Sequence, residues 1–172
     1  YRYFCLQSHY RKALVFTWEN LDNAAAAYTK LIARIAALDP ADGPVDGVSV
    51  ASYLNQDPEQ VFKTLVTKAA SGAYYVFDIP VAENLDLKKA AKAVGEKSVA
   101  MLPQKELLPL TGYVHGGCSP VGMKKQFPTV FHETALLYGT ICVSAGKIGH
   151  QVECDPNALI ALLRAKTADV IV

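Results

Sequence analysis

Apolar residues recur along the chain at two different spacings, and the spacing changes near residue 47. Over residues 18–39 they return every three or four positions, at Leu21, Ala24, Ala25, Tyr28, Leu31, Ile32, Ile35 and Leu38. Such spacing places them on one side of an α-helix, and Asp39-Pro40 predicts the end of that helix. Together with a shorter helix over residues 2–12, this pattern predicts an N-terminal helical hairpin that ends in a turn at residues 41–47.

After residue 47 the pattern changes to short strands and short helices. Alternating apolar residues predict a strand at 61–68, and Ser71-Gly72 predicts a hairpin turn to a returning strand at 73–80. Further helices are predicted at 49–54, at 86–94 (from Asp86 to the C-cap Gly95) and at 103–108 (with Pro103 in its first turn). Further strands are predicted at 98–101, 129–132, 139–144 and 151–154. A last helix begins at residue 155 and is expected to bury Leu159, Ile160, Leu162 and Leu163. The predicted fold class is α+β (mixed α/β), with a mixed and partly closed sheet.

Composition limits the class of protein. The chain has 172 residues, of which 51% are hydrophobic and 19% charged, so we expect one packed domain, or one domain with an appendage. A net charge of +1 implies no whole-molecule attraction to nucleic acid, although it leaves room for a local basic patch. The apolar runs are too short to span a bilayer and the N-terminus does not resemble a signal peptide, so we expect no membrane partner.

The four cysteines are Cys5, Cys118, Cys142 and Cys154. None belongs to a C-x-x-C pair or has a histidine at zinc-ligand spacing, so no metal site is expected. Because the sequence shows no secretory signal, we expect reduced thiols and a cytoplasmic location. No phosphate-binding glycine motif is present either, so no cofactor is expected.

A glycine-rich stretch at residues 112–125 carries the strongest candidate chemistry. Glycine pairs are used where the backbone must approach something closely, and Ser119-Pro120 fixes the exit of the stretch. The free backbone N–H groups of such a loop could hold an anion or a developing oxyanion, and a plain structural turn carries about equal weight. Cys118 lies in this loop as a possible nucleophile, but no histidine partner for it can be argued from the sequence.

Lysines supply the other candidate groups. Alternation places Lys63 on one face of its strand with Val61 and Leu65, where it would either line a pocket or guard a sheet edge against aggregation. Lys124 and Lys125 end the glycine-rich stretch, and Lys147 lies in a second glycine turn at 145–149. Lysines from separate loops around one cleft would suit a phosphate-bearing ligand, whereas each taken alone is explained by solvation.

Residues 48–172 resemble the YbaK/EbsC family, which is related to the editing domain inserted in prolyl-tRNA synthetases. The matching segments are 57–65 (DPEQVFKTL), 79–82 (IPVA), 85–89 (LDLKK), 111–113 (TGY), 116–122 (GGCSPVG) and 143–147 (VSAGK). The resemblance implies a mixed-sheet, barrel-like domain and trans-editing hydrolysis of misacylated Cys-tRNA(Pro), and less selectively of Cys-tRNA(Cys). It implies aminoacyl-tRNA as the partner.

The resemblance also implies roles for individual residues. Lys63 matches the family's essential lysine, which holds the aminoacyl-tRNA terminus, and Gly116 and Pro120 match a G-x-x-x-P loop whose backbone amides position the ester carbonyl. Ser119 of the same loop is grouped with these catalytic positions. The neighbouring positions expected to bind substrate are Gly117, Cys118, Gly122, Lys124, Ser144, Gly146 and Lys147. In cysteine-specific members the substrate's own thiol attacks its ester, which requires neither a Ser-His-Asp set nor a metal.

Residues 1–47 carry a second resemblance. Segments 2–11 and 18–21 resemble the helical region after the catalytic domain of cysteinyl-tRNA synthetases, and none of the synthetase's catalytic motifs is present. The chain is therefore divided into 1–47 and 48–172, with prolyl- or cysteinyl-tRNA synthetase as a further expected partner. The first segment replaces the N-terminal helix and strand of the family. The alternative function is thus a non-catalytic tRNA- or synthetase-binding module with an incomplete pocket.

Overall fold

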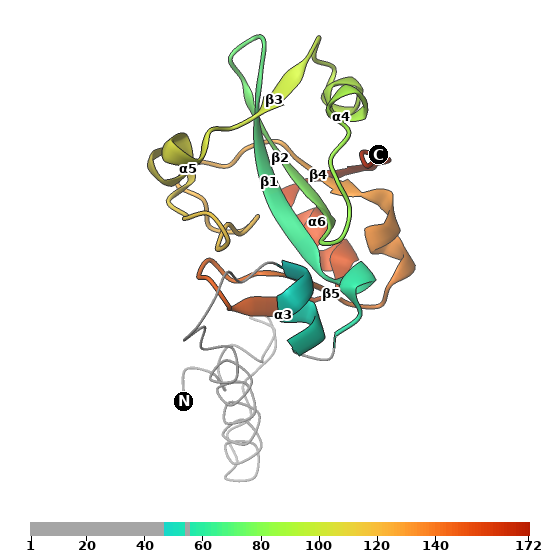
Figure 1. Cartoon of the computed structure of the whole chain (residues 1–172). Helices are drawn as coiled ribbons and strands as arrows, with labels where there is room; N and C mark the ends of the chain where they lie inside the picture. The colour runs from blue at the N-terminus through green and yellow to red at the C-terminus, as the bar shows by residue number, and fades with distance from the viewer. Residues whose placement is uncertain (1–46, 54–55) are drawn as a thin grey trace, which may run out of the picture. The chain divides into compact units, whose positions relative to one another are not determined.

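The computed structural model describes residues 47–53 and 56–172 (Figure 1). The helical hairpin predicted before residue 47 lies outside the described residues. In chain order the elements are α3 (Gly47–Tyr53), the 3-10 helix η1 (Pro58–Gln60), β1 (Phe62–Ala69), β2 (Tyr74–Pro80), α4 (Leu87–Val94), β3 (Val99–Met101), α5 (Gln104–Thr111), β4 (Thr129–His132), the 3-10 helix η2 (Glu133–Leu137), β5 (Ile141–Ser144), β6 (Gln151–Cys154), α6 (Pro156–Leu163) and β7 (Lys166–Ala168). None of the helices in these residues is long and apolar enough to cross a bilayer.

The main sheet has five strands in the order β3-β1-β2-β4-β7. Strands β1 and β2 form the predicted antiparallel hairpin, β3 is antiparallel to β1, and β4 and β7 add in parallel beyond β2. Strands β5 and β6 form a separate antiparallel pair, which a parallel bridge from Val61 to Cys142 connects to the start of β1. This mixed arrangement confirms the predicted α+β class, although within the described residues the strands do not close into a barrel.

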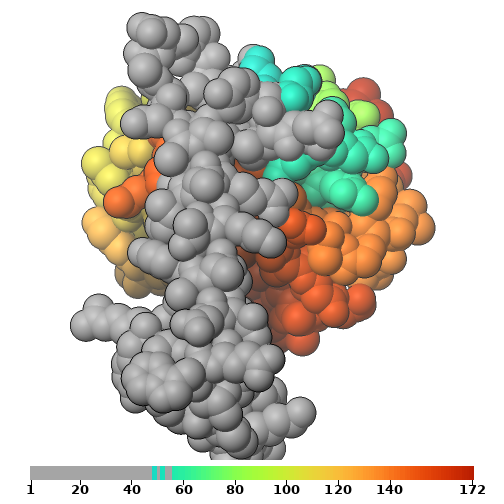
Figure 2. Space-filling view, turned by 90° about the horizontal axis from the view of Figure 1, so that it is seen from below, coloured from blue at the N-terminus to red at the C-terminus, as the bar shows by residue number. Residues whose placement is uncertain are grey.

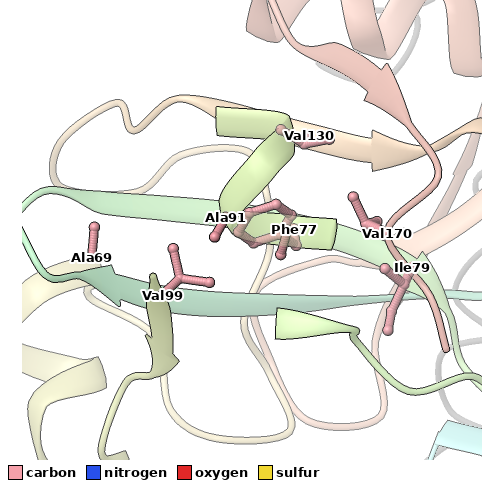
Figure 3. Packing of buried hydrophobic residues seen from close by; sticks show 8 residues of the cluster. Ala69, Phe77, Ile79, Ala91, Val99, Val130 and Val170 are labelled. Carbon is pink, nitrogen blue, oxygen red and sulfur yellow. The ribbon is translucent and has the colours of Figure 1, made fainter. Parts of the chain in front are cut away.

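Helix α4 covers one face of the main sheet, and α5 with the loop after it lies on the other side (Figure 1). On the first face, Phe77 and Ile79 of β2 pack with Ala91 of α4, Val130 and Val170 (Figure 3). On the second face, a separate apolar cluster gathers Val66, Val76, Leu102, Leu107 and Cys118. Seen from below, the C-terminal residues coloured orange to red occupy much of the visible described surface, next to the teal residues of α3 and η1 (Figure 2).

Local signals placed several element ends correctly. The carboxylate of Asp86 accepts hydrogen bonds from the backbone N–H groups of Lys88 and Lys89, and Gly95 ends α4 with a φ of 74°. Gly72 turns the β1–β2 hairpin with a φ of 90°. These signals worked because each depends only on residues a few positions apart.

Two predictions about the helices were wrong, and two further elements were not predicted. Helix α5 continues through Pro109 to Thr111, with Pro103 as its N-cap, because the buried side chains of Leu107 and Thr111 hold its last turn. On α6 the side chain of Leu162 is 67% exposed, because it lies roughly 110° around the helix from the side that faces the protein. Strand β7 and helix η2 were not predicted, since neither shows regular alternation of apolar residues.

Candidate active site

A cleft of about 480 Å³ opens along one edge of β1. Strand β3 pairs with β1 only from Thr67 to Ala69, and the bridge to β5 lies at Val61. In the described part of the chain, no strand lies beside the edge between these points. The walls come from β1, from the start of α5, from the glycine loop and from the β5–β6 turn. The residues that line it include Phe62, Lys63, Thr64, Leu65, Val66, Met101, Leu102, Gln104, Leu107, His115, Gly116, Cys118, Ser144, Gly149, His150 and Gln151.

Strand β1 contributes one cationic side chain to the cleft wall, that of Lys63. Its ammonium donates a hydrogen bond to the backbone oxygen of Val81 at 2.9 Å, and the side chain is half-buried. Burial lowers the pKa of Lys63, and the charge of Glu83 opposes that shift. Strand β1 lies between β3 and β2, but β3 does not reach Lys63, so the interpretation of Lys63 as a lysine at a local sheet edge also stays a prediction. Since an ammonium has three N–H groups, two remain for a ligand.

The glycine loop, residues 112–122, is held against the β5–β6 turn by close backbone contact. A Cβ atom on Gly117 would lie 3.0 Å from the backbone nitrogen of Ile148, and one on Gly146 would lie 2.8 Å from a ring carbon of Tyr113. The hydroxyl of Tyr113 donates to the backbone oxygen of Val121 at 2.6 Å, which secures the same ring to the end of the loop. Only glycine permits this approach, so the loop and the turn form one wall of the cleft.

The structure brings together four of the predicted site residues. Lys63, Gly116, Cys118 and Ser144 line the same cleft, although the first two lie far apart in the chain. The remaining seven predicted positions, Gly117, Ser119, Pro120, Gly122, Lys124, Gly146 and Lys147, are not among the lining residues.

Several of these remaining positions have contacts that shape the loop. The buried hydroxyl of Ser119 accepts the backbone N–H of Val121 at 3.3 Å, which stabilises the turn at Pro120. The ammonium of Lys124 lies 3.4 Å from the backbone oxygen of Pro109, at the end of α5. Lys147 is exposed in the β5–β6 turn. Their predicted roles toward substrate remain predictions.

Cys118 contributes an uncharged thiol to the wall of the cleft. It is buried at the back of the cleft, and burial raises the pKa of its thiol to about 12, with the charge of Asp78 adding to the shift. A thiol with that pKa is protonated near neutral pH, which argues against Cys118 as a nucleophile. Within residues 47–53 and 56–172, no three His, Cys, Asp or Glu side chains gather in a way that could hold a metal ion.

Sequence reasoning did not single out the polar residues beside Lys63. Thr64 lines the cleft, and its hydroxyl donates to the carboxylate of Asp78 at 2.6 Å. Asp78 is fully buried, and burial raises its pKa to about 7, against the opposing effect of the Thr64 hydrogen bond. An acid between Phe77 and Ile79 in an apolar strand was a visible signal for a special role. His115, His150 and Gln151 also line the cleft, and their order in the chain offers no such signal.

Comparison with known proteins decides the family. A sequence profile described as "Aminoacyl-tRNA editing domain" matches residues 45–162. The chain belongs to this family. Over 122 residues it is 49% identical to the protein named "Putative Cys-tRNA(Pro)/Cys-tRNA(Cys) deacylase EbsC" from Enterococcus faecalis (strain ATCC 700802 / V583), and the match covers 71% of this chain and 74% of that protein.

Solved structures agree with this assignment. One is titled "Crystal structure of a putative trans-editing enzyme for prolyl tRNA synthetase" and is 29% identical in sequence. The match covers 72% of this chain and 78% of the solved chain, with a TM-score of 0.66. A crystal structure of a hypothetical protein is 25% identical, covers 76% and 87% of the two chains, and gives a TM-score of 0.69. The resemblance to the YbaK/EbsC family, and with it an enzyme of the aminoacyl-tRNA deacylase and editing class, is confirmed. The resemblance of residues 1–47 to cysteinyl-tRNA synthetase stays a prediction, as does the division of the chain at residue 47.

Proposed function

We propose that this editing-family chain hydrolyses the ester bond of misacylated Cys-tRNA(Pro), and less selectively that of Cys-tRNA(Cys). The observation that carries the proposal is that Lys63 and Gly116 line one cleft. The name of the relative from Enterococcus faecalis, at 49% identity, supports the same substrate class. A cleft of about 480 Å³ is also of the size that proteins use for small ligands, and so suits a terminal aminoacyl-adenosine.

In this proposal the cleft binds and orients the ester, and the substrate supplies the nucleophile. Lys63 holds oxygens of the tRNA terminus with its two remaining N–H groups. Backbone N–H groups of the loop at 116–119, before Pro120, hold the ester carbonyl and stabilise the oxyanion that forms on it. Ser119 and Pro120 keep that loop in shape, and the exposed Lys124 and Lys147 contact tRNA phosphates.

The covalent step is the attack of the substrate's cysteine thiolate on its own ester carbonyl. A C–S bond forms and the C–O bond to the ribose breaks. The proton that the thiol gave up passes to the ribose oxygen, which leaves as a hydroxyl. Water then opens the cysteine thiolactone. The attack is intramolecular, because thiol and carbonyl belong to one substrate, and the cleft holds them in a reactive orientation. The protonated Cys118 therefore does not need to react.

The test is single-turnover hydrolysis of Cys-tRNA(Pro) and Ala-tRNA(Pro). We expect hydrolysis of Cys-tRNA(Pro) to be accelerated over the spontaneous reaction, and Ala-tRNA(Pro), which has no thiol, to be left nearly unchanged. Lys63→Ala should lower the rate by about 100-fold or more, the effect of removing a charged group that positions substrate. Lys88→Ala, at an exposed lysine of α4, is the matched control.

Two results would count against the proposal. Folded protein that does not accelerate hydrolysis of Cys-tRNA(Pro) would refute it and favour the non-catalytic binding module. Equal losses in Lys63→Ala and Lys88→Ala would show that the cleft lysine has no particular role. Association with prolyl- or cysteinyl-tRNA synthetase and a cytoplasmic location remain predictions from the resemblance.

A further inference from the structure

A buried carboxyl group, that of Asp78, is hydrogen-bonded to Thr64 of the cleft wall. Asp78 lies in the middle of β2 with no exposed surface, between Phe77 and Ile79 of the apolar core. One of its oxygens accepts the hydroxyl of Thr64, and the other, Oδ2, has no hydrogen-bond partner among the described residues. Burying an acid with an unpaired oxygen costs stability that an apolar residue of similar size would not.

The hydrogen bond to Asp78 decides what Thr64 presents to the cleft. When Asp78 is ionised, above its pKa of about 7, the Thr64 hydroxyl directs its one proton at the carboxylate, at 2.6 Å. Only its oxygen lone pairs are then left for a ligand, so Thr64 is an acceptor and not a donor there. The carboxylate behind it makes that oxygen a stronger acceptor, and above all for a cation.

The backbone of Thr64 adds an acceptor at the same place. The hydrogen bonds from Val81 to Val61 and from Ala69 to Ala73 show that odd-numbered residues of β1 direct their backbone groups at β2. In an antiparallel pair these positions alternate, so the carbonyl of Thr64 points away from β2, on the same side as the N–H group of Thr64. It points to the edge along which the cleft opens.

Lys63 and Thr64 divide the recognition of charge between the two faces of β1. Lys63 pairs with Ile79, and Thr64 with Asp78, so their side chains leave the strand on opposite faces. Lys63 offers N–H groups to oxygen atoms of a ligand, whereas Thr64 offers oxygen to its N–H groups. Besides Lys63, the titratable side chains that line the cleft are His115, His150 and Cys118.

We propose that Thr64, backed by Asp78, accepts hydrogen bonds from the α-ammonium group of the aminoacyl ester and selects substrates whose amino group is free. The inference rests on the proposed function, since it assigns one more group of the same substrate. An ammonium fits better than a ribose hydroxyl, because it brings a positive charge toward a buried acid that has one oxygen unpaired. Asp78 does not line the cleft, so it acts as a positioning residue through Thr64.

The test is binding rather than turnover. Two stable amides of adenosine serve as probes: 3′-deoxy-3′-(L-cysteinylamino)adenosine, and its 3-mercaptopropanoyl counterpart, which lacks only the amino group. Calorimetric titration of the wild-type protein should show that the cysteinyl probe binds about tenfold more tightly, the effect of one hydrogen bond to a charged group. Asp78→Asn and Thr64→Val should reduce that ratio to about twofold or less, and Thr64→Ser should restore it.

Thr67→Val is the matched control for these variants. Thr67 is a buried threonine of the same strand on the opposite face, so its replacement should leave the ratio of the two affinities unchanged. A merely structural role for Asp78 would weaken both probes equally and keep the ratio. That result overturns the inference. If the wild-type protein binds the two probes equally, or binds neither of them, the inference is overturned as well.

Hydrolysis of Cys-tRNA(Pro) by the same wild-type preparation separates this inference from the proposed function. Protein that prefers the cysteinyl probe but does not hydrolyse Cys-tRNA(Pro) refutes the proposed function alone. Protein that hydrolyses Cys-tRNA(Pro) with no preference between the probes refutes the ammonium site alone.

Discussion

The two faces of the β1–β2 hairpin bury different kinds of groups. The face toward α4 is apolar and closely packed, and its centre is Phe77 with Ala91, Val130 and Val170 (Figure 3). The opposite face buries an acid at Asp78 and a protonated thiol at Cys118, beside an open cleft. Because side chains alternate along a strand, one hairpin supplies both the stable core and a costly polar site. We infer that packing on the apolar face compensates for the stability that is lost by burying polar groups on the opposite face.

The largest expected effect is on the α4 face. Phe77→Ala should lower the free energy of unfolding by about 3–5 kcal/mol, the range for removing a buried aromatic ring and leaving a cavity. Urea denaturation monitored by circular dichroism measures it. Leu137→Ala is the control, because that side chain is 76% exposed and should cost less than about 0.5 kcal/mol. Similar losses in both variants would contradict the assignment of this face as the core.

Asp78 should make stability depend on pH in an unusual direction. Its pKa is raised from 3.8 to about 7, so between these values the folded protein holds a proton that the unfolded chain has released. The folded state therefore binds more protons, and its stability falls as pH rises from about 4 to about 7. The full effect is about 4 kcal/mol, the free-energy equivalent of that pKa change.

Comparison with Asp78→Asn isolates this contribution from all other titrating groups. The variant should gain stability relative to the wild-type protein as pH rises through the same window, when urea unfolding is measured at pH 4, 5.5 and 8. A constant difference between the two proteins over this range would show that Asp78 ionises in the folded state as readily as in the unfolded chain.

The cleft wall should be sensitive to a single added methyl group. Gly117→Ala would place a Cβ atom 3.0 Å from the backbone nitrogen of Ile148 and push the glycine loop away from the β5–β6 turn. We expect kcat/KM for Cys-tRNA(Pro) to fall by about tenfold or more, with a stability loss of about 1–3 kcal/mol. Gly139→Ala, where nothing lies within 4 Å of the new atom, should change neither quantity. Unchanged activity in Gly117→Ala would mean that the position of the loop does not matter.

The smallest expected effect is at Leu162, which the amphipathic pattern of the last helix predicted to be buried. Since the side chain is 67% exposed, Leu162→Ser should change the free energy of unfolding by less than about 0.5 kcal/mol. Leu159→Ser, at a buried position of the same helix, should cost several times more in the same urea titration. Equal losses of unfolding free energy in the two variants would show that Leu162 is buried after all, as the sequence pattern predicted.

Elements whose signals are local could be predicted well. The cap at Asp86, the end of α4 at Gly95 and the hairpin turn at Gly72 each depend on neighbouring residues, and the structure has all three. The prediction failed where packing between distant elements overrides a local signal, as at Pro109, through which α5 continues. It also failed for β7, a strand that exists because β4 offers an edge to pair with.

The sequence by itself determined the family, the glycine loop and the lysine at position 63, because these depend on residue identity and on order along the chain. Only the tertiary structure decided that Lys63 and Gly116 face one cleft, and that Asp78 supports Thr64 behind its wall. The physical reason is that the cleft is the uncovered stretch of a sheet edge, and its position depends on where β3 and β5 stop pairing with β1. No spacing of residues along the chain encodes that end point.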